Sequence, residues 1–168
     1  MRSWLLLIGL VLATFNAGAQ QPIKSATSNE LVDKLAPPQA ATRSLRNLTP
    51  APREPEPRTI DLVVQFDFGS ALLQESSKPL LTSLAEAMVD ERIKALRFRV
   101  EGHTDAVGKA SYNRQLSEKR AQSVAEFLST KGVEKDRLVA EGKGASELLL
   151  PDKPDAMENR RVRITTLN

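Results

Sequence analysis

The chain has 168 residues, enough for one ordinary domain with an additional segment, and it contains no cysteine. The core must therefore be stable without disulfide bonds, and the chain lacks the cysteine through which a lipoprotein carries its lipid. Its 24 basic and 21 acidic residues nearly balance, which indicates a mixed, solvated surface and excludes the strongly basic surface of a typical nucleic-acid-binding protein.

The first residues have the pattern of a secretory signal peptide. Arg2 provides a positive charge, residues 4–14 form an apolar stretch, and Ala17-Gly18-Ala19 offers small residues for cleavage. The apolar stretch is shorter than the roughly 20 residues that a membrane-spanning helix needs. We therefore predict a cleaved signal peptide over residues 1–19, export of the chain and no transmembrane span.

Residues 20–58 have the composition of a linker, because they contain seven of the ten prolines. Such a segment buries too little apolar surface to offset the entropy of ordering it, so we predict that it is largely disordered. Within it, residues 29–36 (NELVDKLA) have helical spacing at Leu31 and Leu35. This piece is compatible with a short docking helix and also with a transient helix in a disordered tail.

From Thr59 onward, regular patterns predict alternating strands and helices. Apolar and polar residues alternate in residues 60–68, 96–101, 138–142 and 162–166, as in half-buried strands. Residues 77–91 and 111–131 carry apolar side chains three or four positions apart, as in amphipathic helices. Pro79 is tolerable in a first helical turn, and Gly132 is a plausible C-cap.

These elements predict an α+β fold. Alternating strands have only one apolar face, so both helices should cover the same face of the sheet. Helical crossovers make the first strand pairings parallel where those strands are neighbours, and the last strand is free to run antiparallel. We therefore predict a two-layer βαβαββ sandwich with a mixed sheet and helices on one face, over residues 59–168.

The polar loop after the second predicted strand is the place where chemistry is expected. This loop, residues 102–108, contains Asp105, and a carboxylate there faces the helix that follows. The long side chain of Arg120 leans back toward the start of that helix. The two charges can therefore lie close together without being fully paired to each other.

Five stretches match, in order, the motifs of a known family. They are VQFDF with Ser70 and Ala71, VEGHTDAVG from Val100, YNRQLSEKRAQSV from Tyr112, LVAEGKG from Leu138 and NRRVRI from Asn159. Together they span nearly all of residues 59–168, and their combination is more specific than any one motif alone. The chain resembles the OmpA-like peptidoglycan-binding domain family. The resemblance implies a βαβαββ domain that binds meso-diaminopimelate in the stem peptides of the cell wall, without a cofactor.

The resemblance also implies roles for individual residues. Asp105 matches the aspartate that pairs with the ammonium group of diaminopimelate, and Arg120 matches the arginine that takes its distal carboxylate. A ligand with an ammonium and a carboxylate on one carbon does require one anion and one planar, bidentate cation at a fixed spacing. The other positions that the resemblance places at or beside the pocket are Phe66, Asp67, Thr104, Asn113, Leu116, Arg160 and Arg161.

Catalysis and metal binding are not predicted. His103 is the only histidine, and a triad with Asp105 and Ser111 or Ser117 would be crowded in sequence and lack a nucleophile elbow. With no second histidine and no cysteine, a metal site is not expected either. We therefore interpret His103 as a turn residue that satisfies backbone groups.

A basic stripe on the polar face of the sheet has a simpler interpretation than nucleic-acid binding. Exposed aromatic side chains usually accompany the arginines of a nucleic-acid surface, and the strand aromatics here are expected on the apolar face. We interpret the stripe as a solvated face in which Glu101 and Asp61 are interspersed. Its members are Arg97, Arg99, Arg161 and Arg163.

The sequence thus predicts an exported, non-enzymatic protein of the periplasm, cell wall or outer membrane that binds peptidoglycan. The alternative is an envelope adaptor that acts mainly through protein–protein contacts, made by the domain or by residues 29–36 in the linker. A flagellar-motor stator subunit shares the domain type but requires a membrane-spanning helix.

Overall fold

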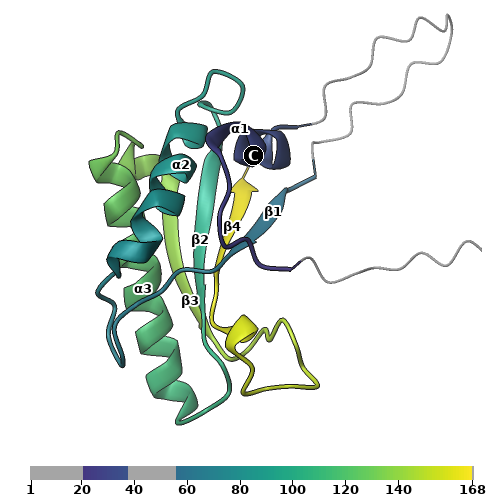
Figure 1. The fold of residues 1–168 in the computed structure, drawn as a ribbon, viewed down its shortest axis with the longest axis vertical. Helices are drawn as coiled ribbons and strands as arrows, with labels where there is room; N and C mark the ends of the chain where they lie inside the picture. The colour runs from purple at the N-terminus through teal and green to yellow at the C-terminus, as the bar shows by residue number, and fades with distance from the viewer. Residues whose placement is uncertain (1–20, 38–55, 168) are drawn as a thin grey trace, which may run out of the picture.

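Four strands form one mixed sheet, and two long helices lie side by side along one of its faces (Figure 1). The structure is a computed structural model that describes residues 21–37 and 56–167. The strands are β1 (Thr59–Leu62), β2 (Arg97–His103), β3 (Leu138–Gly144) and β4 (Val162–Leu167). The helices are α1 (Ser28–Leu35), α2 (Lys78–Met88) and α3 (Ala110–Thr130). No helix in these described ranges is both long and apolar enough to cross a membrane.

The predicted fold class and the order of its elements are confirmed. The strand order in the sheet is β1-β4-β2-β3, with β2 and β3 parallel and β4 antiparallel to both of its neighbours. Val100 of β2 lies opposite Ile164 of β4, and both side chains are fully buried beneath the helices. Because β1 and β2 are not neighbours, the first helical crossover does not produce a parallel pair.

Helix α3 lies unusually close to the ends of β2 and β3, and two glycines allow this. A Cβ atom at Gly102 would lie 2.2 Å from the backbone oxygen of Ser117, and one at Gly142 would lie 2.4 Å from the backbone nitrogen of Glu118. Ser117 also accepts a hydrogen bond at its Oγ from the backbone nitrogen of Gly144, at 2.8 Å. This contact fixes the height of α3 over the sheet and therefore the positions of the side chains that α3 carries.

The first strand is shorter than the alternation of residues 60–68 predicts. β1 ends at Leu62, and beyond it Phe66 forms only an isolated bridge with Leu73. Phe68 is fully exposed, so the expectation that it faces the core is wrong. The chain leaves the sheet here and turns at Gly69, whose φ of +62° lies in the left-handed region.

Residues 21–37 are folded onto the domain, which differs from the disordered linker that their composition predicts. Leu31, Val32 and Leu35 of α1 are buried in the same core as the sheet and α2. Ahead of α1, Ile23 pairs with β1: its backbone nitrogen donates to Asp61 O at 2.7 Å. The candidate helix at residues 29–36 is therefore present and packs on its own domain. The predicted signal peptide and residues 38–55 of the predicted linker lie outside the described residues.

Thr27 caps α1, and its replacement should loosen the attachment of this helix. The Thr27 hydroxyl accepts a hydrogen bond from the backbone nitrogen of Glu30, and the Glu30 carboxylate accepts one from the backbone nitrogen of Thr27. We expect Thr27→Ala to lower the free energy of unfolding by about 1 kcal/mol, measured by urea denaturation. Thr27→Ser retains the hydroxyl and should behave like the wild type. Equal stability of the alanine variant and the wild type would contradict a capping role.

Candidate ligand-binding cleft

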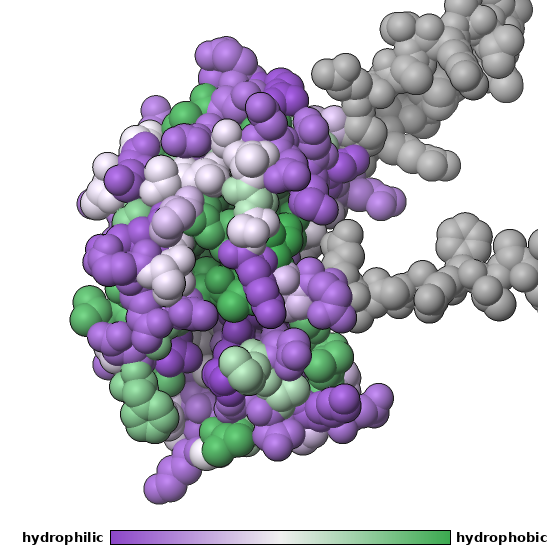
Figure 2. Space-filling view, in the orientation of Figure 1, coloured by the Kyte–Doolittle hydropathy of each residue, from purple (hydrophilic) through white to green (hydrophobic). Residues whose placement is uncertain are grey.

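A cleft of about 820 Å³ opens where β2 ends and α3 begins. Its walls come from the segment after β1, the loop between β2 and α3, the first turns of α3 and the loop before β4. In Figure 1 these connections lie in the lower half of the molecule, and in Figure 2 that half carries green apolar groups between purple polar ones. The site thus combines charged side chains with apolar walls.

Most of the residues that the sequence singled out line this cleft. They are Phe66, Asp67, Thr104, Asp105, Asn113, Leu116, Arg120 and Arg160. The structure adds six further lining residues: Phe68, Gly69, Gln74, Val107, Tyr112 and Asp155. Three of these six, Phe68, Val107 and Tyr112, belong to the matched motifs, so their position in the motifs was a usable signal. Gln74 and Asp155 carried no comparable signal.

Arg120 is fixed along its length while its end stays available. Its Nε donates to the backbone oxygen of Ser70 at 3.0 Å, and its guanidinium carbon lies 4.9 Å from the centre of the Phe66 ring. Burial lowers the pKa of Arg120, and the positive charge of Arg160 lowers it further, but a guanidinium remains protonated. Its two terminal nitrogens make no hydrogen bond to any described residue. They can therefore receive a carboxylate from a ligand.

Asp105 lies in the same cleft, and its counterion is Arg160. The Oδ2 atom of Asp105 lies 2.7 Å from Nη1 of Arg160, and its Oδ1 accepts a hydrogen bond from the backbone nitrogen of Val107 at 3.2 Å. In the described part of the chain no hydrogen bond or ion pair joins Asp105 to Arg120. The cleft therefore presents an anion and a cation that do not neutralise each other.

Asn113 shapes the loop that carries Asp105. Its side-chain nitrogen donates to the backbone oxygens of Asp105, at 3.3 Å, and of Val107, at 2.9 Å. The neighbouring Thr104 is buried, and its hydroxyl has no hydrogen-bond partner among the described residues. Because buried polar groups are normally paired, the hydroxyl of Thr104 is a candidate ligand contact at the base of the cleft.

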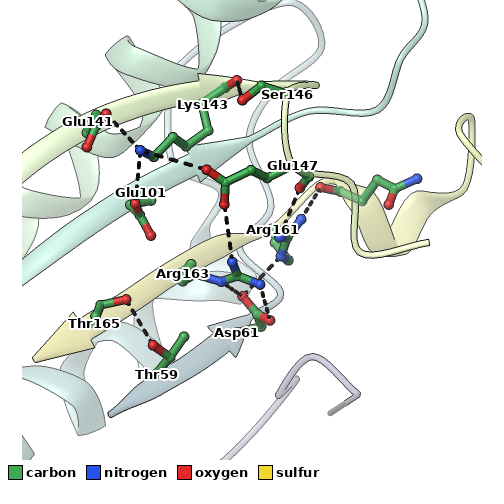
Figure 3. Close-up of polar contacts among 11 residues, drawn as sticks. Thr59, Asp61, Glu101, Glu141, Lys143, Ser146, Glu147, Arg161, Arg163 and Thr165 are labelled. Carbon is green, nitrogen blue, oxygen red and sulfur yellow. Dashed lines mark hydrogen bonds and ion pairs between the residues drawn. The ribbon is translucent and has the colours of Figure 1, made fainter. Parts of the chain in front are cut away.

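Arg161 does not line the cleft, although the resemblance placed it at the binding site. Its side chain is only 1% exposed; Nε lies 3.0 Å from Oδ1 of Asp61, and Nη2 donates to the backbone oxygen of Glu147 at 3.1 Å. Arg163 pairs with the same carboxylate at 2.9 Å (Figure 3). These arginines join β1, β4 and the loop after β3, so this half of the predicted basic stripe consists of paired charges and is not a solvated surface.

His103 is a buried strand residue, which differs from the turn residue predicted. It ends β2, is 2% exposed, and neither ring nitrogen has a hydrogen-bond partner among the described residues. Burial, together with the positive charges of Arg161 and Arg163, lowers the pKa of His103 to about 3. The imidazole is therefore neutral at pH 7. No group of three His, Cys, Asp or Glu side chains suited to a metal ion is found within residues 21–37 and 56–167.

Comparison with known proteins identifies the family to which the chain is similar. Residues 65–163 match the OmpA family. The chain is 33% identical over 109 residues to Outer membrane protein A of Escherichia fergusonii, which covers 65% of this chain and 45% of that protein. The chain spans between 12% and 45% of the length of the curated relatives it matches.

Solved structures agree with the fold. The peptidoglycan-associated lipoprotein from Burkholderia pseudomallei is 29% identical with a TM-score of 0.53, covering 62% of this chain and 88% of that one. The cell wall anchor of the T6SS from Pseudomonas aeruginosa is also 29% identical with a TM-score of 0.53, covering 66% of this chain and 81% of that one. The residues that line the cleft, from Phe66 to Arg160, all lie within residues 65–163, the range that matches the OmpA family.

Proposed function

Because the chain belongs to the OmpA family, we propose that it binds peptidoglycan non-covalently through this cleft, by recognising the zwitterionic end of meso-diaminopimelate in the stem peptide. The names of its structural relatives support peptidoglycan as the ligand: one is a peptidoglycan-associated lipoprotein and another is a cell wall anchor. The protein acts by binding, without a cofactor or a catalysed reaction. It works in the periplasm, at the cell wall or at the outer membrane, and residues 1–19 direct its export.

One observation carries the choice of ligand: Asp105 and Arg120 line one cleft and are not paired with each other. An amino-acid zwitterion has an ammonium and a carboxylate on the same carbon, so it fits between one anion and one bidentate cation. The ammonium binds Asp105, and the carboxylate binds the two terminal nitrogens of Arg120. Leu116 and Tyr112 provide apolar surface for the methylene chain of the ligand.

An adaptor that acts through residues 29–36 is less well supported. A helix that docks on another protein must present its apolar side chains to that protein. The apolar side chains of α1, Leu31, Val32 and Leu35, are instead buried within this domain. The apolar face of this helix is therefore not available to another protein.

Co-sedimentation with isolated cell-wall sacculi tests the proposal. The protein should sediment with sacculi whose stem peptides contain meso-diaminopimelate, and an excess of free meso-diaminopimelate should return it to the supernatant. N-acetylglucosamine at the same concentration is the matched control and should have no effect. Failure to sediment, or sedimentation that free diaminopimelate does not reduce, would contradict the proposed ligand.

A further inference from the structure

In the cleft, the carboxylate of Asp105 is already paired with a cation of the protein, Arg160. Arg160 places Nη1 2.7 Å from Oδ2 of Asp105, where the ammonium of a ligand would bind. The Arg160 side chain is 42% exposed, whereas the side chain of Asp105 is 16% exposed. The carboxylate is thus the fixed partner, and the guanidinium is the partner that can move away into solvent. An ion pair with one half-exposed partner is weak enough to be exchanged for a ligand.

The backbone beneath Arg160 is held in place, so only its side chain needs to move. The neighbouring Asn159 is fully buried; its Oδ1 accepts from the backbone nitrogen of Leu150, and its Nδ2 donates to the backbone oxygen of Lys153, at 2.9 and 2.8 Å. Arg160 therefore projects from a rigid turn toward Asp105. Displacement of its side chain does not require the loop to rearrange.

The charge that Arg160 carries decides which ligands can displace it. A ligand with only an ammonium would replace Arg160 at Asp105 and leave that guanidinium without its counterion, near the second cation, Arg120. A zwitterion brings a carboxylate along with its ammonium, so both guanidiniums gain a partner when the ligand enters. Asp67 and Asp155 also line the cleft, but both are exposed, and water screens them more strongly than it screens Asp105.

We propose that Arg160 is a resident counterion of Asp105 that makes the cleft selective for a ligand end carrying both charges. The inference rests on the proposed function and deepens it. The cleft discriminates against stem peptides whose third residue is lysine, because lysine ends in an ammonium with no carboxylate beside it. The discrimination has two sources: with the lysine peptide, neither Arg120 nor the displaced Arg160 gains a carboxylate partner.

Calorimetric titration with two synthetic stem tripeptides separates these sources. The peptides are identical except that the third residue is meso-diaminopimelate in one and lysine in the other, so they differ by one carboxylate. Arg160→Gln removes the charge and retains a shorter, polar side chain. We expect this variant to narrow the preference for the diaminopimelate peptide by about threefold to fivefold, mainly through tighter binding of the lysine peptide.

The matched control is Arg114→Gln, which removes an exposed arginine of α3 that does not line the cleft. It should leave the ratio of the two affinities unchanged, and both variants should unfold at the temperature of the wild type. An unchanged ratio in Arg160→Gln, or equal weakening of both peptides, overturns the inference and leaves the proposed function standing. A wild-type protein that binds neither peptide overturns the proposed function and the inference together.

Discussion

Replacing Asp105 or Arg120 by alanine is expected to remove the protein from sedimented sacculi, because each change weakens binding by about 30-fold or more. Truncating one member of a hydrogen-bonded charge pair at a binding site costs about 2 to 5 kcal/mol. Arg120→Ala also removes the cation above Phe66 and the donor to Ser70, so the wall of the cleft loses its order. Binding is measured by co-sedimentation and by calorimetry with the diaminopimelate tripeptide.

More conservative changes test whether geometry or charge is responsible. Arg120→Lys retains the positive charge but lacks the planar fork, so it should bind more weakly than the wild type and more strongly than Arg120→Ala. Asp105→Asn has the shape of the aspartate without its charge and should be close to Asp105→Ala. Arg114→Ala, on the same helix, should sediment like the wild type. Retention of both Asp105→Ala and Arg120→Ala on sacculi would rule out the charge pair as the binding site.

Replacing Gly102 by alanine is expected to lower the free energy of unfolding by about 3 kcal/mol, at the upper end of the range for overpacking a core. The added Cβ would lie 2.2 Å from the backbone oxygen of Ser117. A backbone atom cannot rotate away as the end of a flexible side chain can, so α3 has to shift from the sheet. Because α3 carries Arg120 and Asn113, binding should weaken even under conditions in which the variant is folded. Urea denaturation measures the stability.

Gly132→Ala is the matched control for this substitution. Its Cβ would meet nothing within 4 Å. Only the backbone φ of +100°, which is unfavourable for alanine, lowers the free energy of unfolding, by about 1 to 2 kcal/mol. It should be less destabilised than Gly102→Ala and should bind the tripeptide like the wild type. If the two variants were equally stable, the close approach of α3 to β2 would not matter to the fold.

The periodic patterns predicted the helices and three of the strands because their apolar faces are continuous in sequence. β2, α2, α3 and β4 lie within a few residues of the predicted ranges. The first strand was overextended, since alternation records which residues are apolar and not whether a neighbouring strand is present. β4 pairs with β1 only from Thr59 to Leu62, so nothing extends the sheet as far as Phe66. Similarly, the many prolines of residues 20–58 led to a prediction of disorder, although eight residues of this segment form α1.

The candidate site was predicted mainly by motif resemblance, and its errors have physical causes. The side chains of consecutive residues in an extended chain point in opposite directions, so Arg160 and Arg161 were not expected to line the same cleft together. That alternation was a usable signal for excluding Arg161. The pairing of Arg160 with Asp105 had no signal, because it depends on the path of the loop before β4. The prediction that His103 is a turn residue was wrong because the motif around it reads as a loop, whereas His103 is the last residue of β2.

The pairing of Ile23 with β1 also covers part of an edge of the sheet. β1 is one of the two edge strands of the sheet, and unpaired backbone groups on an edge strand act as a template for strands of other molecules. Here the backbone nitrogen of Ile23 donates to Asp61, and its oxygen accepts from Val63 at 2.8 Å. The segment around Ile23 therefore pairs with this edge of β1 within the same chain. A shortened form that begins at β1 would expose this margin and acquire a tendency to self-associate.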